Sequence, residues 1–167
     1  MRAPEVWAGY GCRHVSDVYS VGSTIISWLQ PGILGSHDVK PPIFIDAWCI
    51  AKMVKLVETE DERTLDPPAG VANTVKSMYE LGRVLLTQPE DDDSGSMHVP
   101  ARPLRDVLRK MNSTPEVKSL LRLLLAPNFQ RRLSAVQVLK SKAYEALQYA
   151  AVSKLDISKI EQKVSAG

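Results

Sequence analysis

The sequence has few cysteines, few aromatic residues and almost no excess of charge of either sign. Only Cys12 and Cys49 are present among 167 residues, which excludes a disulfide-rich scaffold and indicates reduced thiols. The 21 basic and 19 acidic residues leave a net charge of +2, which does not indicate a basic face for nucleic acid or for an anionic membrane. We therefore expect neither nucleic acid nor a membrane among the partners of the chain.

Long hydrophobic runs and strand patterns are also missing. The longest apolar run, from Val21 to Leu29, is interrupted by glycine, serine and threonine and is shorter than the roughly 18 residues that span a bilayer. No secretory signal is recognisable, so we expect an intracellular protein, cytoplasmic or nuclear. No segment alternates apolar and polar residues and no Asn-Gly hairpin turn occurs. Because the apolar spacing is helical instead, the sequence predicts an all-α fold.

Two helices are predicted in the first third of the chain. The first begins at Ser16 or Asp17, which can cap it, and ends before Pro31. Its apolar residues occupy most faces, so we expect it to be the buried central helix. The second, with Asp46 as its cap, is predicted to be an amphipathic surface helix whose buried stripe comprises Ile50, Met53, Val54 and Val57.

The remaining helices are expected at 73–88, 104–111, 114–125 and 134–147. Thr114 is the predicted N-cap of the third, with Pro115 at its first helical position, and Ser134 is the predicted N-cap of the fourth. The polar segments between these helices predict linkers. Residues 152–167 keep only a thin apolar pattern, so we expect them to fray.

Three motifs, in this order, resemble those of the eukaryotic protein kinases. Ala3-Pro4-Glu5 matches the motif that ends the activation segment, and Asp17-Val18-Tyr19-Ser20-Val21-Gly22 resembles the Asp-Val-Trp-Ser-Leu-Gly helix of that family. The stretch LLLAPNFQRRLSAVQVLKSKAY resembles the closing pattern of the domain. Arg132, Ser134, Ala135 and Leu139 fall in register with it, whereas Asn128, Ser141 and Lys142 depart from its Asp, His and Pro.

This resemblance implies the helical C-terminal lobe of a protein-kinase-like fold over residues 1–150, with a divergent insertion at about 58–100 and a C-terminal tail at 151–167. The N-terminal lobe and the catalytic loop are lacking. Phosphoryl transfer in the family needs a Gly-rich loop, a strand lysine, His-Arg-Asp and Asp-Phe-Gly, all of which precede Ala-Pro-Glu. We therefore expect no catalytic, cofactor-binding or metal-binding residue here, and ATP and Mg only in a full kinase domain.

The resemblance implies a fragment of a Ser/Thr protein kinase that is itself catalytically incompetent. Met1 stands where the family usually has an aromatic residue, so we expect a start imposed inside a longer domain, by truncation or by an incomplete gene model. The alternative is a non-catalytic, pseudokinase-like interaction module that binds a protein substrate or regulator. The sequence indicates no oligomeric state.

Four residues are singled out as structural or docking positions. A buried carboxylate at Glu5 would need a partner, which Arg132 can supply, and the family pairs these two positions; alternatively, both are solvated surface charges. Asp17 stabilises a helix N-terminus, and the resemblance adds that it anchors the central helix to the catalytic loop. Trp48 lies on the helix where the family often docks substrates and regulators, so it marks a possible docking surface.

Metal-binding patterns are weak. Cys12-Arg13-His14 has no second pair of ligands, and the histidines are scattered. The run Asp91-Asp92-Asp93 lacks the spaced oxygens of a calcium loop, so it predicts a solvated loop.

Overall fold

The structure is a computed structural model that describes residues 2–38, 44–57, 67–86 and 99–165, with side chains described up to Ser153. These residues form helices and loops and contain no strand, so the predicted all-α class is confirmed for them. The helices are α1 (Pro4–Trp7), α2 (His14–Leu29), α3 (Ile45–Val57), α4 (Asn73–Leu86), α5 (Leu104–Lys110), α6 (Pro115–Leu124), α7 (Ala135–Leu139) and α8 (Lys142–Ser165).

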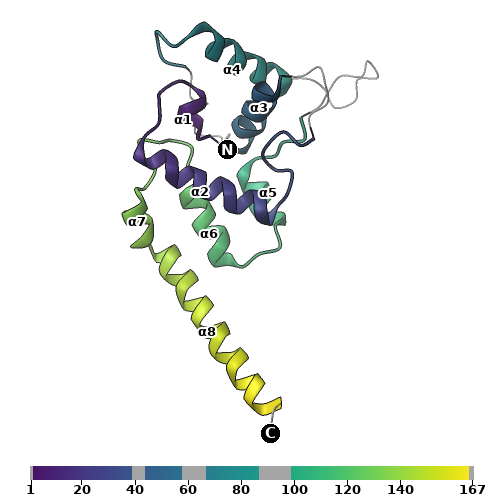
Figure 1. Cartoon of the computed structure of the whole chain (residues 1–167), viewed down its shortest axis with the longest axis vertical. Helices are drawn as coiled ribbons and strands as arrows, with labels where there is room; N and C mark the ends of the chain where they lie inside the picture. The colour runs from purple at the N-terminus through teal and green to yellow at the C-terminus, as the bar shows by residue number, and fades with distance from the viewer. Residues whose placement is uncertain (1, 39–43, 58–66, 87–98, 166–167) are drawn as a thin grey trace.

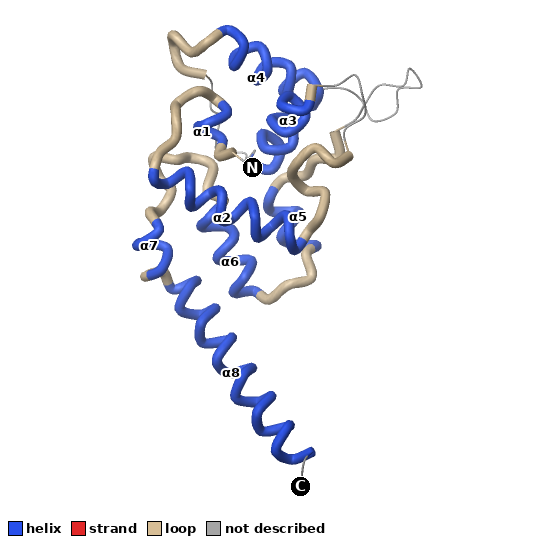
Figure 2. Tube along the Cα trace, in the orientation of Figure 1, coloured by secondary structure: helices blue, strands red, loops and turns tan. Residues whose placement is uncertain are grey.

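The helices divide into a packed body and one projecting element (Figure 1). At one end of the body α3 and α4 pack against each other, with α1 beside α3. In the middle α2 crosses α6, and α5 lies near the C-terminal end of α2. The trace in Figure 2 shows α8 leading away from α7 and carrying the C-terminus far from the body. The helix α4 lies inside the segment that the sequence predicts to be a divergent insertion.

The most extensively buried helix is α3, whereas the sequence predicted that α2 would be the buried central helix. Nine of the thirteen residues of α3 are buried, including Lys52, so this helix is not the amphipathic surface helix that its apolar stripe suggested. By contrast, α2 exposes Val21 (53%) and Trp28 (81%). The difference arises because α1, α4 and α5 all pack on α3, whereas the described chain covers α2 on one side only.

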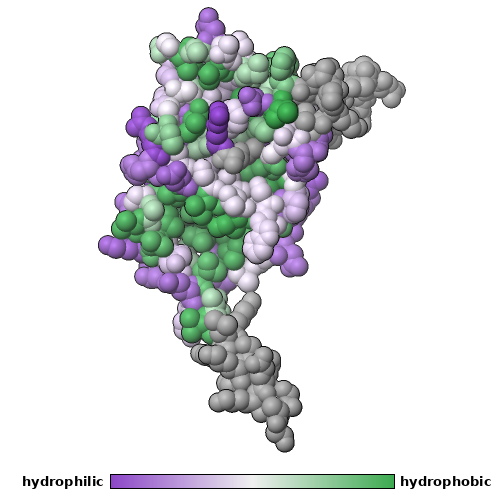
Figure 3. All heavy atoms as spheres, viewed as in Figure 1, coloured by the Kyte–Doolittle hydropathy of each residue, from purple (hydrophilic) through white to green (hydrophobic). Residues whose placement is uncertain are grey.

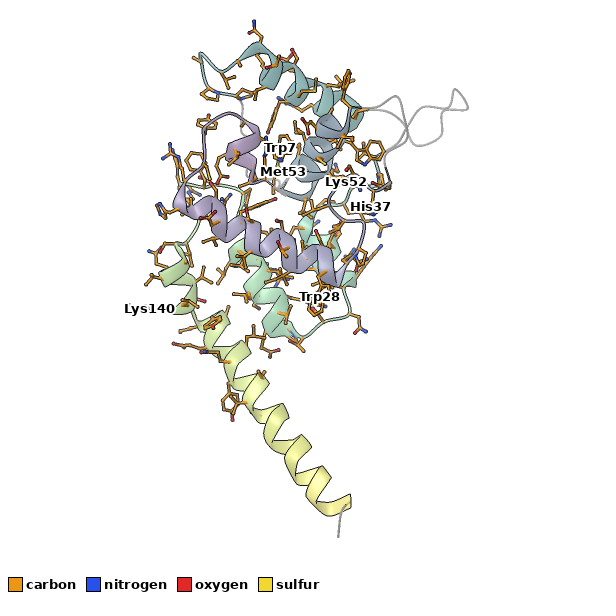
Figure 4. All side chains as sticks on the ribbon, in the orientation of Figure 1. Trp7, Trp28, His37, Lys52, Met53 and Lys140 are labelled. Carbon is orange, nitrogen blue, oxygen red and sulfur yellow. The ribbon has the colours of Figure 1, made fainter. Side chains whose placement is uncertain are left out.

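The main hydrophobic core joins residues from five helices. Tyr19 and Ile26 of α2 pack with Met53 of α3, and Figure 4 shows Met53 with Trp7 between α1 and α3. Other members of this core are Ile50, Leu56, Tyr79, Leu108, Leu121 and Leu125. A second cluster under α7 and α8 contains Val18, Leu120, Leu124 and Val138. Leu108 of α5 and Leu120, Leu121 and Leu124 of α6 are therefore core residues.

Helix ends follow their caps closely, with two differences from the prediction. Thr114 caps α6, where its Oγ1 accepts a hydrogen bond from the Val117 N–H at 3.5 Å, and Ser134 caps α7 in the same way. At the start of α2, Ser16 accepts from the backbone N–H of Arg13 at 3.0 Å, so the helix begins at His14, before both expected caps. Similarly, α3 begins at Ile45, which places Asp46 inside its first turn.

The predicted last helix is divided at Ser141. Its hydroxyl donates to the Val138 carbonyl at 2.7 Å and accepts from the Tyr144 N–H at 3.3 Å, which ends α7 and starts α8. This side chain satisfies backbone groups of both helices at one point. The segment for which the sequence predicts a fraying tail is helical in the structure up to Ser165.

A glycine in α4 allows close packing on α3. A Cβ atom at Gly82 would lie 2.8 Å from Ile50 Cγ2 and 3.0 Å from the Ala47 carbonyl oxygen. Although alanine normally stabilises a helix by about 1 kcal/mol relative to glycine, we expect Gly82→Ala to lower the free energy of unfolding by about 1–3 kcal/mol because the helices must separate. Urea titration followed by circular dichroism measures this change.

Ser77→Ala is the control, since Ser77 is exposed on the same helix. It should change stability by less than about 0.5 kcal/mol. A Gly82→Ala protein as stable as the Ser77→Ala protein would contradict the close contact of α3 and α4.

Candidate functional site

The predicted partners Glu5 and Arg132 form a buried, two-pronged ion pair. Arg132 Nη1 donates to Glu5 Oε1 at 2.7 Å and Nη2 donates to Oε2 at 3.1 Å, and both side chains are fully buried. Glu5 comes from α1, where Pro4 at the first helical position and the acidic residue behind it suit a helix start. The pair therefore joins α1 to the loop between α6 and α7, 127 residues away along the chain.

The remaining hydrogen-bonding capacity of this pair is also used inside the protein. The guanidinium donates to the carbonyl oxygens of Val15, Ala126 and Pro127 at 3.1, 2.8 and 3.2 Å. All five N–H groups of Arg132 thus have an acceptor. Ser16 Oγ donates to Glu5 Oε1 at 2.7 Å. Because no donor is left over for a ligand, this centre is structural.

Tyr19 lies against the guanidinium of this network. Arg132 Cζ is 4.9 Å from the centre of the Tyr19 ring, within the range of a cation–π contact. Burial raises the pKa of the phenol far above its ordinary value, and the nearby Arg132 charge opposes that shift only in part. The hydroxyl has no hydrogen-bond partner within the described residues. Tyr19 is therefore a neutral core residue at physiological pH.

Asp17 is exposed in the first turn of α2. Its carboxylate there interacts favourably with the positive end of the helix dipole. The capping hydrogen bond itself involves Ser16, so Asp17 is not the cap. Asp17 and the two exposed apolar residues of α2, Val21 and Trp28, lie at positions i, i+4 and i+11 and share one helix face.

The exposed face of α2 carries two large hydrophobic side chains. Figure 3 shows apolar side chains gathered where α2 crosses α6. Trp28 is at the C-terminal end of α2 in Figure 4 and is 81% exposed. An exposed tryptophan and an exposed valine on one helix face, about two turns apart, suit a surface that packs against other protein.

Trp48 is a core residue and is not itself part of a docking surface. Its side chain is 3% exposed, and its Nε1–H donates to Asp38 Oδ1 at 3.0 Å. It packs with Ala51 of α3 and Leu85 of α4. The reason is the position of Trp48 on the side of α3 that faces α4 and the loop after α2, which the sequence pattern of α3 alone did not reveal.

A buried lysine forms a second charged centre, which the sequence reasoning missed. Lys52 Nζ contacts both oxygens of Asp38 at 2.7 Å and donates to the Gly32 carbonyl at 2.9 Å, so it ties the loop after α2 to α3. Figure 4 shows Lys52 and His37 of that loop on the same side of the molecule. Lys52 stands between apolar residues predicted to be buried, Ile50 and Met53, and this was the available signal, because a buried amine needs an acceptor.

The Asp38 carboxyl has opposing influences on its pKa. Partial burial raises the pKa of this carboxyl. The hydrogen bonds from Lys52 and Trp48 and the positive charge of Lys52 lower the pKa by more than burial raises it, so the net shift is downward. Asp38 is thus ionised at neutral pH and forms a charge-assisted bond with Lys52.

The described residues offer no cluster of three or more metal-ligating side chains. Cys12 and Cys49 are both free thiols. His98 and the run from Asp91 to Asp93 lie outside the described residues. None of the helices searched in the described part of the chain is long and apolar enough to cross a bilayer.

Comparisons of the chain with known protein families, with curated proteins and with solved structures found no match.

The first prediction for this site concerns the ion pair. Arg132→Ala should lower the free energy of unfolding by about 3–5 kcal/mol, because it leaves the Glu5 carboxylate buried without its partner. Thermal and urea denaturation of the purified chain measure the loss. The control is Lys140→Ala: Lys140 is exposed at the end of α7 (Figure 4), and its removal should cost less than about 0.5 kcal/mol.

A double variant separates the unpaired charge from the lost packing. Glu5→Leu combined with Arg132→Met should be more stable than Arg132→Ala alone, since it leaves no buried charge. Equal stability of the Arg132→Ala and Lys140→Ala proteins would contradict the pairing.

The second prediction concerns acid stability. A carboxyl group whose pKa is lower in the folded protein contributes stability above its unfolded pKa and loses that contribution as the pH falls through the folded pKa. The difference in unfolding free energy between the native chain and Asp38→Asn should therefore be constant above about pH 5. This difference in unfolding free energy should shrink as the pH falls below 3.8, the ordinary pKa of an aspartate side chain. Urea titrations between pH 7 and acid pH measure this difference.

Asp17→Asn is the matched control, because Asp17 is an exposed carboxylate with no ion pair in the described residues. It should cost less stability at neutral pH than Asp38→Asn. A difference for Asp38→Asn that stays the same at every pH would show that the Lys52 pair adds nothing.

Proposed function

We propose that the chain is the helical C-terminal lobe of a protein-kinase-like domain, which supports phosphoryl transfer to protein serine or threonine but does not perform it alone. The proposal begins with the three ordered motifs of the sequence. Its main structural support is one observation: the Glu5–Arg132 pair joins the first of these motifs to the last.

The ion pair supports the proposal because two motifs 127 residues apart have no local reason to meet. In the family these positions pair, tying the end of the activation segment to the last helices. Here the same residue types meet with two parallel hydrogen bonds in a fully buried environment. A chance match of short motifs would leave such charges in solvent, where neither needs a partner.

The uncovered face of α2 is a second support. The family's corresponding helix is central, with its N-terminal Asp holding the catalytic loop. Here Asp17, Val21 and Trp28 are exposed along one face of α2. In a complete domain that face would pack against the catalytic loop and the segments around it. This accounts for the exposure of Val21 and Trp28 on a helix face that the described chain leaves open.

The proposed role excludes independent catalysis. The Gly-rich loop, the strand lysine, His-Arg-Asp and Asp-Phe-Gly do not occur in this sequence. ATP and Mg would therefore bind to the rest of the domain, and this lobe would hold the catalytic loop and the end of the activation segment in place.

The alternative role is that of a non-catalytic interaction module. The exposure of Trp28 favours it, since an exposed tryptophan is a common anchor in protein interfaces. In this alternative another protein covers the exposed face of α2. The docking site is then this face and not the surface around Trp48, because Trp48 is buried.

A phosphotransfer assay on two polypeptides tests the proposal. One is the purified 167-residue chain, and the other is the product of the full-length transcript that contains this sequence. With radiolabelled ATP, Mg and a generic protein substrate, the chain alone should transfer no phosphate. The full product should transfer phosphate, and its transcript should encode His-Arg-Asp and Asp-Phe-Gly in frame before Ala3-Pro4-Glu5.

Either of two results contradicts the proposal. Stoichiometric ATP-dependent phosphorylation by the 167-residue chain would show that it contains a catalytic site. A full-length transcript without His-Arg-Asp and Asp-Phe-Gly would exclude the proposed kinase-like role and favour the interaction module.

A further inference from the structure

A cavity of about 760 Å³ lies between the C-terminal end of α2, the loop after it and α5. Its volume is within the range of about 300–1,000 Å³ that is usual for ligand sites. The lining comes from three separate parts of the chain: Gln30 to Ile33, Asp38, and the segment from Pro100 through α5. None of these residues belongs to the Glu5–Arg132 centre.

Two cations are among the residues that line this cavity. Arg102 and Lys110 line it and are exposed. The nearest carboxylate in sequence, Asp106, forms its ion pairs with Arg109 at 3.3 Å and with Arg105 at 3.9 Å. Neither Arg102 nor Lys110 has a carboxylate partner within the part of the chain that the structure describes.

Among the described residues, the one carboxylate that lines the cavity, Asp38, is already neutralised. Both oxygens of Asp38 accept from Lys52 Nζ at 2.7 Å, and Trp48 adds a further hydrogen bond to Oδ1. The Asp38–Lys52 pair therefore contributes no net charge, and the wall that the described residues form has a net positive charge. An anionic group is the ligand that such a wall attracts.

Apolar residues give the same cavity a hydrophobic component. Pro31 and Pro100 line it with two exposed rigid rings, whereas Ile33 and Val107 are core side chains that reach the lining with only small exposed parts, 8% and 5%. A small inorganic anion would leave this apolar surface in water. A ligand with carboxylates beside an aliphatic or aromatic side chain would cover it and meet both cations.

We propose that this cavity binds a short acidic peptide segment of a partner protein, with an apolar side chain against Pro31 and Pro100 and carboxylates on Arg102 and Lys110. Arginine and lysine recognise carboxylates through charge-assisted hydrogen bonds, and acidic motifs are often read by such clusters. This site is independent of the proposed kinase-like role, and either proposal can fail without the other.

Fluorescence anisotropy with two labelled peptides tests the site on the full chain. The probe has the sequence Asp-Asp-Leu-Asp-Phe, and the neutral control replaces each Asp with Asn. The acidic peptide should bind at least about tenfold more tightly than the neutral one, because charged hydrogen bonds are lost in the control. Arg102→Gln and Lys110→Gln should each weaken the acidic peptide by about threefold to tenfold.

Arg122→Gln is the charge-matched control, since Arg122 is exposed on α6 and does not line the cavity. It should leave the affinity unchanged, and circular dichroism should give the same spectrum for all variants. An equal loss in Arg122→Gln would overturn the proposal, because the effect would be one of overall charge. No saturable binding up to about 1 mM would overturn it too, as would tighter binding of a single-stranded oligonucleotide of equal charge.

Discussion

The contact between Glu5 and Arg132 constrains the rest of the structure. Both charges are fully buried, and the cost of taking them out of water is offset only while each oxygen and each N–H has its partner. Satisfying these groups requires the carbonyls of Val15, Ala126 and Pro127 to point at one guanidinium. The pair thereby sets the relative positions of α1, the start of α2 and the turn after α6.

The Asp38–Lys52 contact acts in a similar way at the other end of the body. It attaches the loop after α2 to α3, with the Gly32 carbonyl as a third partner of the amine. The two charged centres have different consequences. The first leaves no donor free, whereas the second borders a cavity whose remaining charges, on Arg102 and Lys110, have no partner in the described residues. Only the second therefore has charge available for a ligand.

The lobe proposed here also explains an imbalance in helix burial. The described residues surround α3 but leave one face of α2 open, with Trp28 at its end. If α2 supports a catalytic loop of a larger domain, that loop would cover the open face of α2. A partner protein on the same face would give the alternative function, and the two occupants would meet the same side chains.

Local sequence determined the helical class, most helix ends and the caps at Thr114 and Ser134, because apolar spacing and capping hydrogen bonds act within a few residues. The residues of the Glu5–Arg132 pair could also be named from sequence. The burial of α3, the place of Trp48, the Asp38–Lys52 contact and the cavity were decided only by tertiary structure. Each depends on which elements pack together from distant parts of the chain, and a helix's own periodicity does not say how many neighbours will cover it.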